Sequence, residues 1–508
     1  MAVARFVGVG VGHYDKGHLR LDRAVPDVEQ VASLLEASFQ CTVLPDPDEQ
    51  GARDCLKDLR GSMPERGGRL VWAPSAGSAL RAISTFGASI RRLELPAGIG
   101  DDHPGDGVEP AGLMPDLHVL PGIWTAVKGY DPLLARLRSL GYREPSPGGP
   151  GNLIPVPYDW RLSCRYNGGR LGSIIEPALQ RWRDQGGPYA GAQVVFVCHS
   201  MGGLVARWYI EKCGGAEIAR KLITLGTPYR GAANALAQLV NGGHSGLGPF
   251  RIELTRFARS MPSLYQLMPE YACLQRDGDL VKTTGVTLPE LDAARVTDAM
   301  RFYTDLHDAE GRRPQSLTAT HAIVGTTQPT ATTARLAGGR VELLDSYQDQ
   351  DLYGDSTVPV VAACRPDVPM DSNTLRRVPD KHGNLPRNAA ALDEVEGILT
   401  ARSIIVKAAR PVALRVEAPE FALAGQPITL RVTPAEPTRQ AIRAAVTSET
   451  GILIETRVLR PTGGTITIDG LAPGAYTIDV AGPDRTAPFA PVSSDILIWD
   501  SGHDPAGG

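Results

Sequence analysis

One serine in this 508-residue chain stands in a pattern that predicts a nucleophile. Residues 194–197 are all apolar and predict a short buried strand, residues 198–203 predict a sharp turn around Ser200, and residues 204–208 predict a helix. Small residues beside such a turn let strand and helix pack closely and expose the hydroxyl, and a helix N-terminus stabilises developing negative charge. The alternative is an ordinary glycine-rich turn, because Cys198 stands where a glycine is usual.

A serine hydroxyl needs a base, and two later residues are suited to supply one. Asp355 stands in Gly-Asp-Ser-Thr-Val-Pro, a turn before an apolar strand, and His382 follows 27 residues later in Asp-Lys-His-Gly-Asn. The order Ser, Asp, His is expected when a late histidine loop reaches the serine and an aspartate orients the imidazole. The competing residues lack this loop context or order: Asp345, Asp349 and Asp351 for the acid, and His118, His199, His244, His307 and His321 for the base.

Four motifs occur in one order between residues 117 and 400: Tyr-Asp-Trp-Arg at 158–161, His-Ser-Met-Gly-Gly at 199–203, Leu-Gly-Thr-Pro at 225–228 and Gly-Asp-Ser-Thr-Val-Pro at 354–359. On these motifs the region resembles the lecithin:cholesterol acyltransferase family of α/β-hydrolases. The segment 263–269, Ser-Leu-Tyr-Gln-Leu-Met-Pro, resembles the cap segment of that family.

The resemblance implies a role for each candidate residue. Ser200 would be the nucleophile, His382 the general base and Asp355 the acid that orients it. The oxyanion would be bound by the backbone N–H groups of Met201 and Ile123. His199, next to the nucleophile, is interpreted as structural, and no cofactor or metal is expected.

These residues must be positioned by a sheet, and the chain alternates apolar strands with amphipathic helices as an α/β-hydrolase does. We expect a caspase-like α/β segment at 1–95, a linker at 96–116, the α/β-hydrolase at 117–409 with a lid at about 231–320, and an immunoglobulin-like antiparallel β-sandwich at 410–508. The lid carries an apolar helical face, Leu254, Phe257, Ala258 and Met261, which suits either acyl chains or packing onto the core.

The two terminal modules show no catalytic constellation of their own. The first 75 or so residues resemble the start of caspase-like peptidase domains, but the strand at 69–72 is followed by Ala-Pro-Ser-Ala-Gly, and no Asp-x-Cys-x-x-Gly sequence follows. We therefore expect no cysteine peptidase activity. After residue 411 the apolar period changes to two, as in a sandwich.

Composition excludes several classes of function. The 52 basic and 56 acidic residues leave a net charge of −4, which gives no field for steering nucleic acid. Seven cysteines without a Cys-x-x-Cys pair predict neither a disulfide framework nor a zinc site. No apolar run is long enough for a membrane span or a signal peptide, so we expect a cytoplasmic protein. Only eight of the basic residues are lysine, which is typical of a G+C-rich bacterial genome.

The leading expectation is a serine-dependent lipase, phospholipase or lipid O-acyltransferase in lipid metabolism, acting on a lipid or other acyl ester. Two alternatives stay open. One is an esterase or amide hydrolase acting on a non-lipid substrate. The other is an effector scaffold whose terminal modules bind a protein partner and whose hydrolase is activated on assembly.

Overall fold

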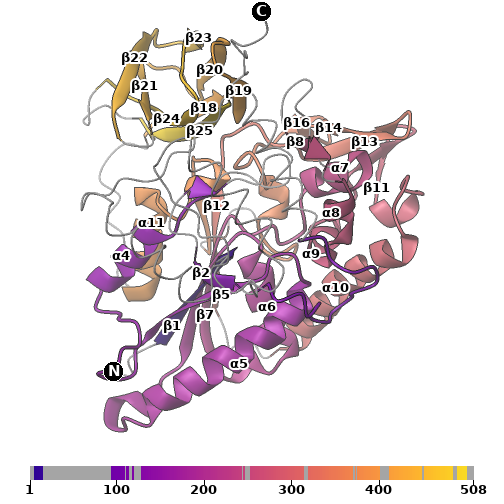
Figure 1. Ribbon diagram of the computed structural model, residues 1–508, viewed down its shortest axis with the longest axis vertical. Helices are drawn as coiled ribbons and strands as arrows, with labels where there is room; N and C mark the ends of the chain where they lie inside the picture. The colour runs from indigo at the N-terminus through magenta and orange to yellow at the C-terminus, as the bar shows by residue number, and fades with distance from the viewer. Residues whose placement is uncertain are drawn as a thin grey trace, which may run out of the picture.

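A seven-stranded sheet forms the centre of the larger unit of the molecule (Figure 1). The computed structural model describes residues 5–14, 93–108, 110–113, 117–118, 127–242, 244–245, 252–253, 255–313, 319–369, 372, 374–400, 411–448, 451–483 and 489–499. The strands pair in the order β17-β12-β7-β6-β1, with β5 and β2 both on β1. Their bounds are β1 Arg5–Tyr14, β2 Pro110–Leu113, β5 Leu153–Tyr158, β6 Val194–His199, β7 Ala219–Leu225, β12 Ala319–Gly325 and β17 Leu375–Val378.

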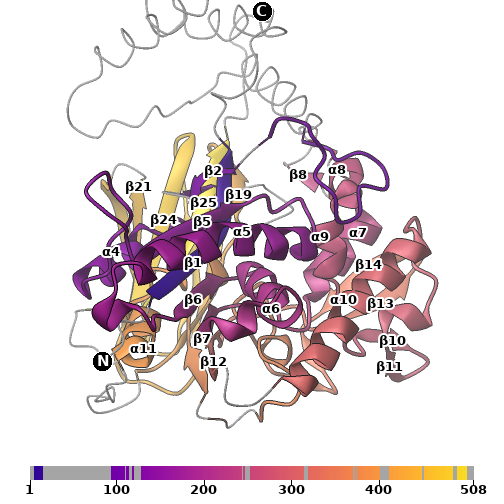
Figure 2. The ribbon, with the colours of Figure 1, turned by 90° about the horizontal axis from the view of Figure 1, so that it is seen from below.

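Helices cover both faces of this sheet, which explains why β6 is apolar without alternation. Val195 and Val197 pack with α4 (Asp131–Ser139) and α11 (Ala389–Thr400) on one face. The alternate residues Val194, Phe196 and Cys198 pack with α5 (Cys164–Arg183) and α6 (Gly202–Lys212) on the other (Figure 2). All six residues of β6 are therefore buried, as expected for a parallel strand covered on both sides.

The first strand of the chain lies within this sheet. β1 pairs in parallel with β6 over Arg5–Val9 and with β5 over Phe6–Val11. The hydrolase sheet was expected to begin instead near His118, but β3 (Leu117–His118) pairs antiparallel with β4 (Val127–Lys128) in a separate two-stranded sheet. β1 offers ten residues without proline, whereas the segment 117–120 is only four residues long and is followed by a proline, which cannot donate to a ladder. The expected helices at 26–39 and 53–59 lie outside the described residues.

Two insertions extend the hydrolase unit. The first follows β7 and contains α7 Ala233–Asn241, β8 His244–Ser245, β9 Ile252–Glu253, α8 Thr255–Ser260, α9 Pro262–Gln266, β10 Leu274–Arg276, β11 Asp279–Val281 and α10 Ala293–Arg312. The second, which was not expected, follows β12 and contains β13 Thr333–Ala337, β14 Arg340–Leu344, β15 Ser346–Tyr347 and β16 Gln350–Asp351. Strands from both insertions form one four-stranded sheet, β11-β10-β13-β14, so the lid and the second insertion are joined.

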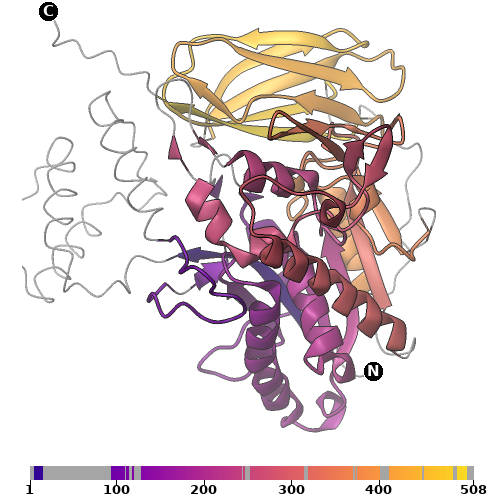
Figure 3. The same cartoon turned by 90° about the vertical axis from the view of Figure 1, so that its right-hand side faces the viewer.

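The C-terminal residues form a β-sandwich that lies against one end of the hydrolase unit (Figure 3). One sheet has the order β18-β20-β23 and the other β19-β25-β24-β21-β22. Their bounds are β18 Leu414–Glu417, β19 Phe421–Leu423, β20 Ile428–Pro434, β21 Ile442–Ser448, β22 Leu453–Leu459, β23 Gly464–Ile468, β24 Gly474–Ala481 and β25 Val492–Trp499.

The apolar period of two in this segment corresponds to the inward faces of the sandwich. Leu414 and Val416 on β18 and Ile478 and Val480 on β24 are all buried in its core. Among the described strands of the sandwich, the pairings are antiparallel except that of β19 with β25, and an isolated bridge joins Val412 and Phe489 in parallel. The fold class, an α/β-hydrolase with a lid insertion followed by a β-sandwich, is thus confirmed. The exact division into the four segments 1–95, 96–116, 117–409 and 410–508 stays a prediction.

Candidate active site

Ser200 lies on the turn between β6 and α6 in a strained backbone conformation. Its φ is +54°, in the left-handed region that L-residues seldom adopt, and its backbone N–H donates to the Leu225 carbonyl at 2.9 Å. A Cβ on Gly203 would lie 2.1 Å from Oγ1 of Thr227, whose hydroxyl donates to the Ser200 carbonyl at 2.8 Å. Only glycine at 203 allows α6 to approach this closely, and the turn presents Ser200 at the end of β6.

His382 lies beside this serine, at the start of a short 3₁₀ turn after β17. Its Nε2 is 2.8 Å from the Ser200 Oγ, and its Nδ1 is 2.8 Å from Oδ2 of Asp355. A carboxylate oxygen accepts, so Nδ1 carries the proton and Nε2 is free to accept from the hydroxyl. All three side chains are buried, with Ser200 8% exposed, Asp355 1% and His382 3%. We call Ser200, His382 and Asp355 the candidate triad.

Asp355 is held by its own turn and by close contacts that only glycine permits. Its Oδ1 accepts from the backbone N–H groups of Thr357 (3.0 Å) and Val358 (2.6 Å), which leaves Oδ2 for His382. A Cβ on Gly325, the last residue of β12, would lie 2.4 Å from the Asp355 Cβ. The carboxylate is therefore aimed by backbone donors and by the end of a central strand.

A second histidine supports the first through its backbone. The Nε2 of His199 donates to the His382 carbonyl at 3.0 Å, and its Nδ1 accepts from the Tyr130 hydroxyl at 3.1 Å. Burial and the neighbouring His382 ring, 4.8 Å away, hold the pKa of His199 well below its ordinary value. A neutral ring with this tautomer suits both hydrogen bonds. The sequence predicted a structural role for His199 but gave no sign of its partner Tyr130, which lies 69 residues away.

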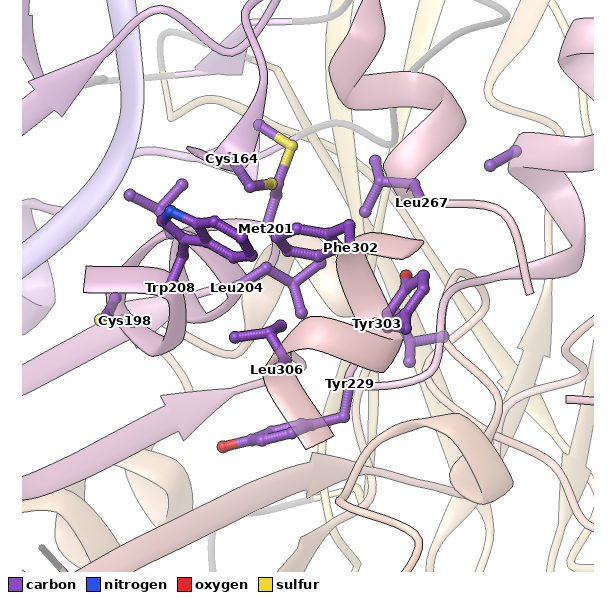
Figure 4. Close-up of a cluster of buried hydrophobic side chains, with 14 of the residues drawn as sticks. Cys164, Cys198, Met201, Leu204, Trp208, Tyr229, Leu267, Phe302, Tyr303 and Leu306 are labelled. Atoms are coloured by element: carbon purple, nitrogen blue, oxygen red, sulfur yellow. The ribbon is translucent and has the colours of Figure 1, made fainter. Parts of the chain in front are cut away.

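Of the two expected oxyanion donors, Met201 and Ile123, only Met201 belongs to the described residues. Met201 follows Ser200 directly as the N-cap of α6, so its N–H is at the positive end of the helix. Its side chain is buried among Cys164, Leu204 and Phe302 (Figure 4). Ile123 lies outside the described residues.

The competing acids and bases are found elsewhere. Asp345, Asp349 and Asp351 belong to the hairpins of the second insertion, and Asp355 is the carboxylate that contacts His382. His307 lies on α10, His321 on β12, His118 on β3 and His244 on β8. Within the described parts of the chain no three His, Cys, Asp or Glu side chains gather in a metal-binding arrangement.

The lid helices pack onto the core with their apolar faces. On and beside α8, Phe257, Ala258 and Met261 are all at most 2% exposed, and Phe257 meets Trp160 edge to face at 5.9 Å. Phe302 of α10 stacks on Trp208 of α6 at 5.3 Å (Figure 4). Of the two expectations for this face, core packing is therefore the one that this conformation adopts; Leu254 lies outside the described residues.

Arg161 of the Tyr-Asp-Trp-Arg motif joins three parts of the chain. Its fully buried guanidinium pairs with Asp159 at 2.7 Å and with Asp106 at 2.8 Å, and it donates to the Leu93 carbonyl at 3.0 Å. Its own carbonyl accepts from the Ser263 hydroxyl of α9. The segment expected to be a linker thus supplies a partner to a buried charge. Asp106 is one of several aspartates in a Gly- and Pro-rich run, and nothing in its local sequence predicts this ion pair.

Part of the chain matches the model of a known protein family. Residues 102–329 match the model of the family described as lecithin:cholesterol acyltransferase. This region is therefore lecithin:cholesterol acyltransferase-like, and the match supports a lipid hydrolase or acyltransferase of the α/β-hydrolase type. None of the curated proteins matches the chain.

Several solved structures are similar to parts of the chain. The Tle4-Tli4 complex matches at 13% identity and a TM-score of 0.40, over 78% of this chain and 97% of that one. The lipase BlEst2 of Bacillus licheniformis in its propeptide form matches at 13% identity and a TM-score of 0.29, over 67% and 86%. The fn3 domain of human collagen alpha-1(XX) matches at 13% identity and a TM-score of 0.16, over 21% and 94%. In the described part of the chain, no helix combines the length and the apolar character that crossing a bilayer demands.

Proposed function

We propose, from the premise that residues 102–329 are lecithin:cholesterol acyltransferase-like, that this protein is a serine hydrolase of lipid esters that works through Ser200, His382 and Asp355. The observation that carries the proposal is the pair of 2.8 Å contacts that join His382 to Ser200 on one side and to Asp355 on the other. Hydrogen bonds of this length and order are what an activated serine requires.

The proposed reaction has two halves. His382 Nε2 takes the proton from the Ser200 hydroxyl as Oγ attacks the ester carbonyl carbon, and the Met201 N–H donates to the resulting oxyanion. His382 then protonates the leaving alcohol as the carbon–oxygen ester bond breaks. Water or a second alcohol, deprotonated by the same imidazole, attacks the acyl carbon. The bond between that carbon and the Ser200 Oγ then breaks, and the imidazolium returns the proton to Oγ. Asp355 holds the tautomer and stabilises the imidazolium in both halves.

Replacing the nucleophile tests the proposal. Ser200→Ala should lower kcat for a p-nitrophenyl ester by about 10⁴-fold or more, because the acyl-enzyme can no longer form. Ser173→Ala, an exposed serine on α5, is the matched control and should keep wild-type turnover. Turnover that survives in Ser200→Ala would refute the proposal.

The acyl group is tested separately. The family match favours a lipid ester, so phospholipid vesicles should be hydrolysed faster than a soluble short-chain ester at equal ester concentration. A preference for the soluble ester would instead support the non-lipid esterase alternative. Adding a sterol or another alcohol and measuring its acyl ester distinguishes transfer from hydrolysis.

A further inference from the structure

The C-terminal sandwich contacts both loops that carry the acid and the base of the candidate triad. These loops follow β12 and β17, at the carboxyl ends of two adjacent parallel strands, and the sandwich lies beyond that end of the sheet (Figure 3). Ser200 stands apart from these contacts, since its turn is held by Leu225 and Thr227 within the hydrolase unit.

On the histidine loop, the residues that flank His382 bind β25. The Lys381 ammonium donates to the Ser494 hydroxyl at 2.8 Å, and the Asn384 amide donates to the Ser493 carbonyl at 2.8 Å. Asn384 also donates to the buried Asp380 carboxylate at 3.1 Å, which accepts from the Lys381 backbone N–H at 2.7 Å. The turn around His382 is therefore closed from within and tied from outside by the sandwich.

On the aspartate side, Gln328 joins the sandwich to the turn of Asp355. Its side-chain N–H donates to the Leu414 carbonyl at 2.8 Å, and its side-chain oxygen accepts from the Val416 N–H at 3.2 Å. The amide thus pairs with β18, an edge strand, as a neighbouring strand would. The backbone of Gln328 exchanges two 3.0 Å hydrogen bonds with Gly354, the residue before Asp355.

Three further contacts strengthen this side. The Thr330 hydroxyl donates to the Gln328 carbonyl at 2.8 Å and accepts from the Ser356 N–H, directly after Asp355, at 2.9 Å. The Arg415 guanidinium of β18 lies 4.2 Å from the centre of the Tyr353 ring. The Asp355 turn is therefore connected to β18 on both sides of the aspartate.

We propose that the β-sandwich is part of the catalytic apparatus, and that Gln328, Lys381 and Asn384 are positioning residues that hold Asp355 and His382 in register with Ser200. The inference rests on the proposed function, because it assigns a role to the sandwich in that same reaction. A displacement of the catalytic groups by about 1 Å can cost about 10²-fold in rate, so loops that carry two of the three groups need external support. Gln328 is fully buried although it is polar, and its amide is satisfied by the sandwich.

The test uses the full chain and substitutions on both sides of the interface. Gln328→Met keeps the volume but removes both hydrogen bonds, Lys381→Met removes the bond to Ser494, and Ser494→Ala removes the same bond from the sandwich. Each should lower kcat for the p-nitrophenyl ester at least tenfold while KM stays within twofold. Lys381→Arg keeps a donor of similar reach and should retain most of the wild-type kcat. Thr467→Ala, on an exposed position of β23, is the control in the sandwich.

Thermal melting of each variant separates positioning from folding. A fall in kcat at unchanged KM and with the melting midpoint within a few degrees of wild type, reversed in Lys381→Arg, supports the proposal. Wild-type kcat in Gln328→Met and Ser494→Ala overturns it, and so does a loss that follows the unfolded fraction alone. Ser200→Ala is measured in parallel: if it is inactive while the interface variants are fully active, only the positioning role fails.

Discussion

The three residues of the candidate triad differ in how they are held. Ser200 is placed by a strained turn between a buried strand and a helix, whereas His382 is placed by hydrogen bonds to its ring and to its backbone. The neutral ring of His199 belongs to this second kind of support, because it donates to the His382 carbonyl. At this scale the proposed chemistry depends on which nitrogen of His382 carries the proton, and the Asp355 oxygen 2.8 Å from Nδ1 favours Nδ1.

Replacing the acid by its amide should therefore be costly. Asp355→Asn keeps the shape of the side chain but removes the charge that holds the proton on Nδ1, so kcat should fall by about 10⁴-fold. Steady-state ester hydrolysis measures this, with circular dichroism to show the retained fold. Asp351→Asn, in the hairpin of the second insertion, is the comparison and should stay near wild type. Equal effects in the two variants would argue against Asp355 as the acid.

At the residue scale, sequence motifs predicted Ser200, Asp355 and His382, which the fold brings together, while their catalytic roles remain proposals. The residues that support them were not predicted. Tyr130 and Gln328 make contacts across 69 and 86 residues of chain, and a lone tyrosine or glutamine carries no local signal of such a partner. Local patterns report local geometry, and these contacts arise only once the sheet has formed.

At the scale of elements, β12 ends in a glycine because the Asp355 turn packs directly on it. Gly325→Ala would place a Cβ 2.4 Å from the Asp355 Cβ and push the turn away. We expect a loss of kcat of about 10²-fold and a destabilisation of about 1–3 kcal/mol. Gly311→Ala on α10, where an added Cβ meets nothing within 4 Å, is the control and should be neutral or stabilising. Comparable losses in both variants would contradict this.

His321 on β12 should also make the stability of the protein depend on pH. Burial and the neighbouring cations Lys221 and Arg376 lower the pKa of His321 to about 4. Below its ordinary pKa near 6.5 the unfolded chain therefore binds a proton that the folded chain does not, so this histidine lowers stability as pH falls from about 6.5 to about 4. His321→Gln removes that linkage.

The measurement is a pair of urea unfolding series at pH 7.5, 6 and 5. The unfolding free energy of His321→Gln minus that of wild type should increase as pH falls, by at most about 1.4 kcal/mol per pH unit. The comparison of the two proteins cancels the other groups that titrate in this range, among them Glu211, whose pKa burial raises to about 7. A difference that is constant with pH would show that His321 is not held neutral.

Elements were predicted where their pattern was periodic. The inward residues of the sandwich and the buried strand β6 follow their apolar periods closely. The place of β1 between β5 and β6 was not predicted, because a parallel neighbour can come from any distance along the chain. The second insertion was not predicted either, since its strands are only two to five residues long and too short to show an apolar period.

At the scale of the whole molecule, buried Arg161 joins the segment 93–108, the core and the lid. Arg161→Ala would leave Asp159 buried without its counter-charge, which should cost about 3–5 kcal/mol of unfolding free energy. Arg335→Ala breaks an ion pair whose two side chains are about half exposed, and should cost at most about 1 kcal/mol. Chemical denaturation of the two variants makes the comparison, and similar small losses in both would refute the structural role of Arg161.

At the scale of the whole molecule, the sandwich lies against the hydrolase unit (Figure 1) and hydrogen-bonds to Gln328 and Lys381, which neighbour the turns of Asp355 and His382. The sequence motifs predicted a catalytic domain and a separate terminal module. The contacts between that module and the segments next to Asp355 and His382 could not be predicted, because they join single side chains to backbone atoms of β18 and β25.

Every catalytic proposal made here requires that Ser200 is a nucleophile activated by His382. Reaction of the full chain with a fluorophosphonate, followed by mass spectrometry of the peptides, tests it most directly, because such reagents form a covalent bond only with an activated hydroxyl. We expect one adduct, on Ser200, that forms at least about 10³-fold more slowly in His382→Ala. An adduct on another residue, or labelling of Ser200 at an equal rate without His382, would contradict it.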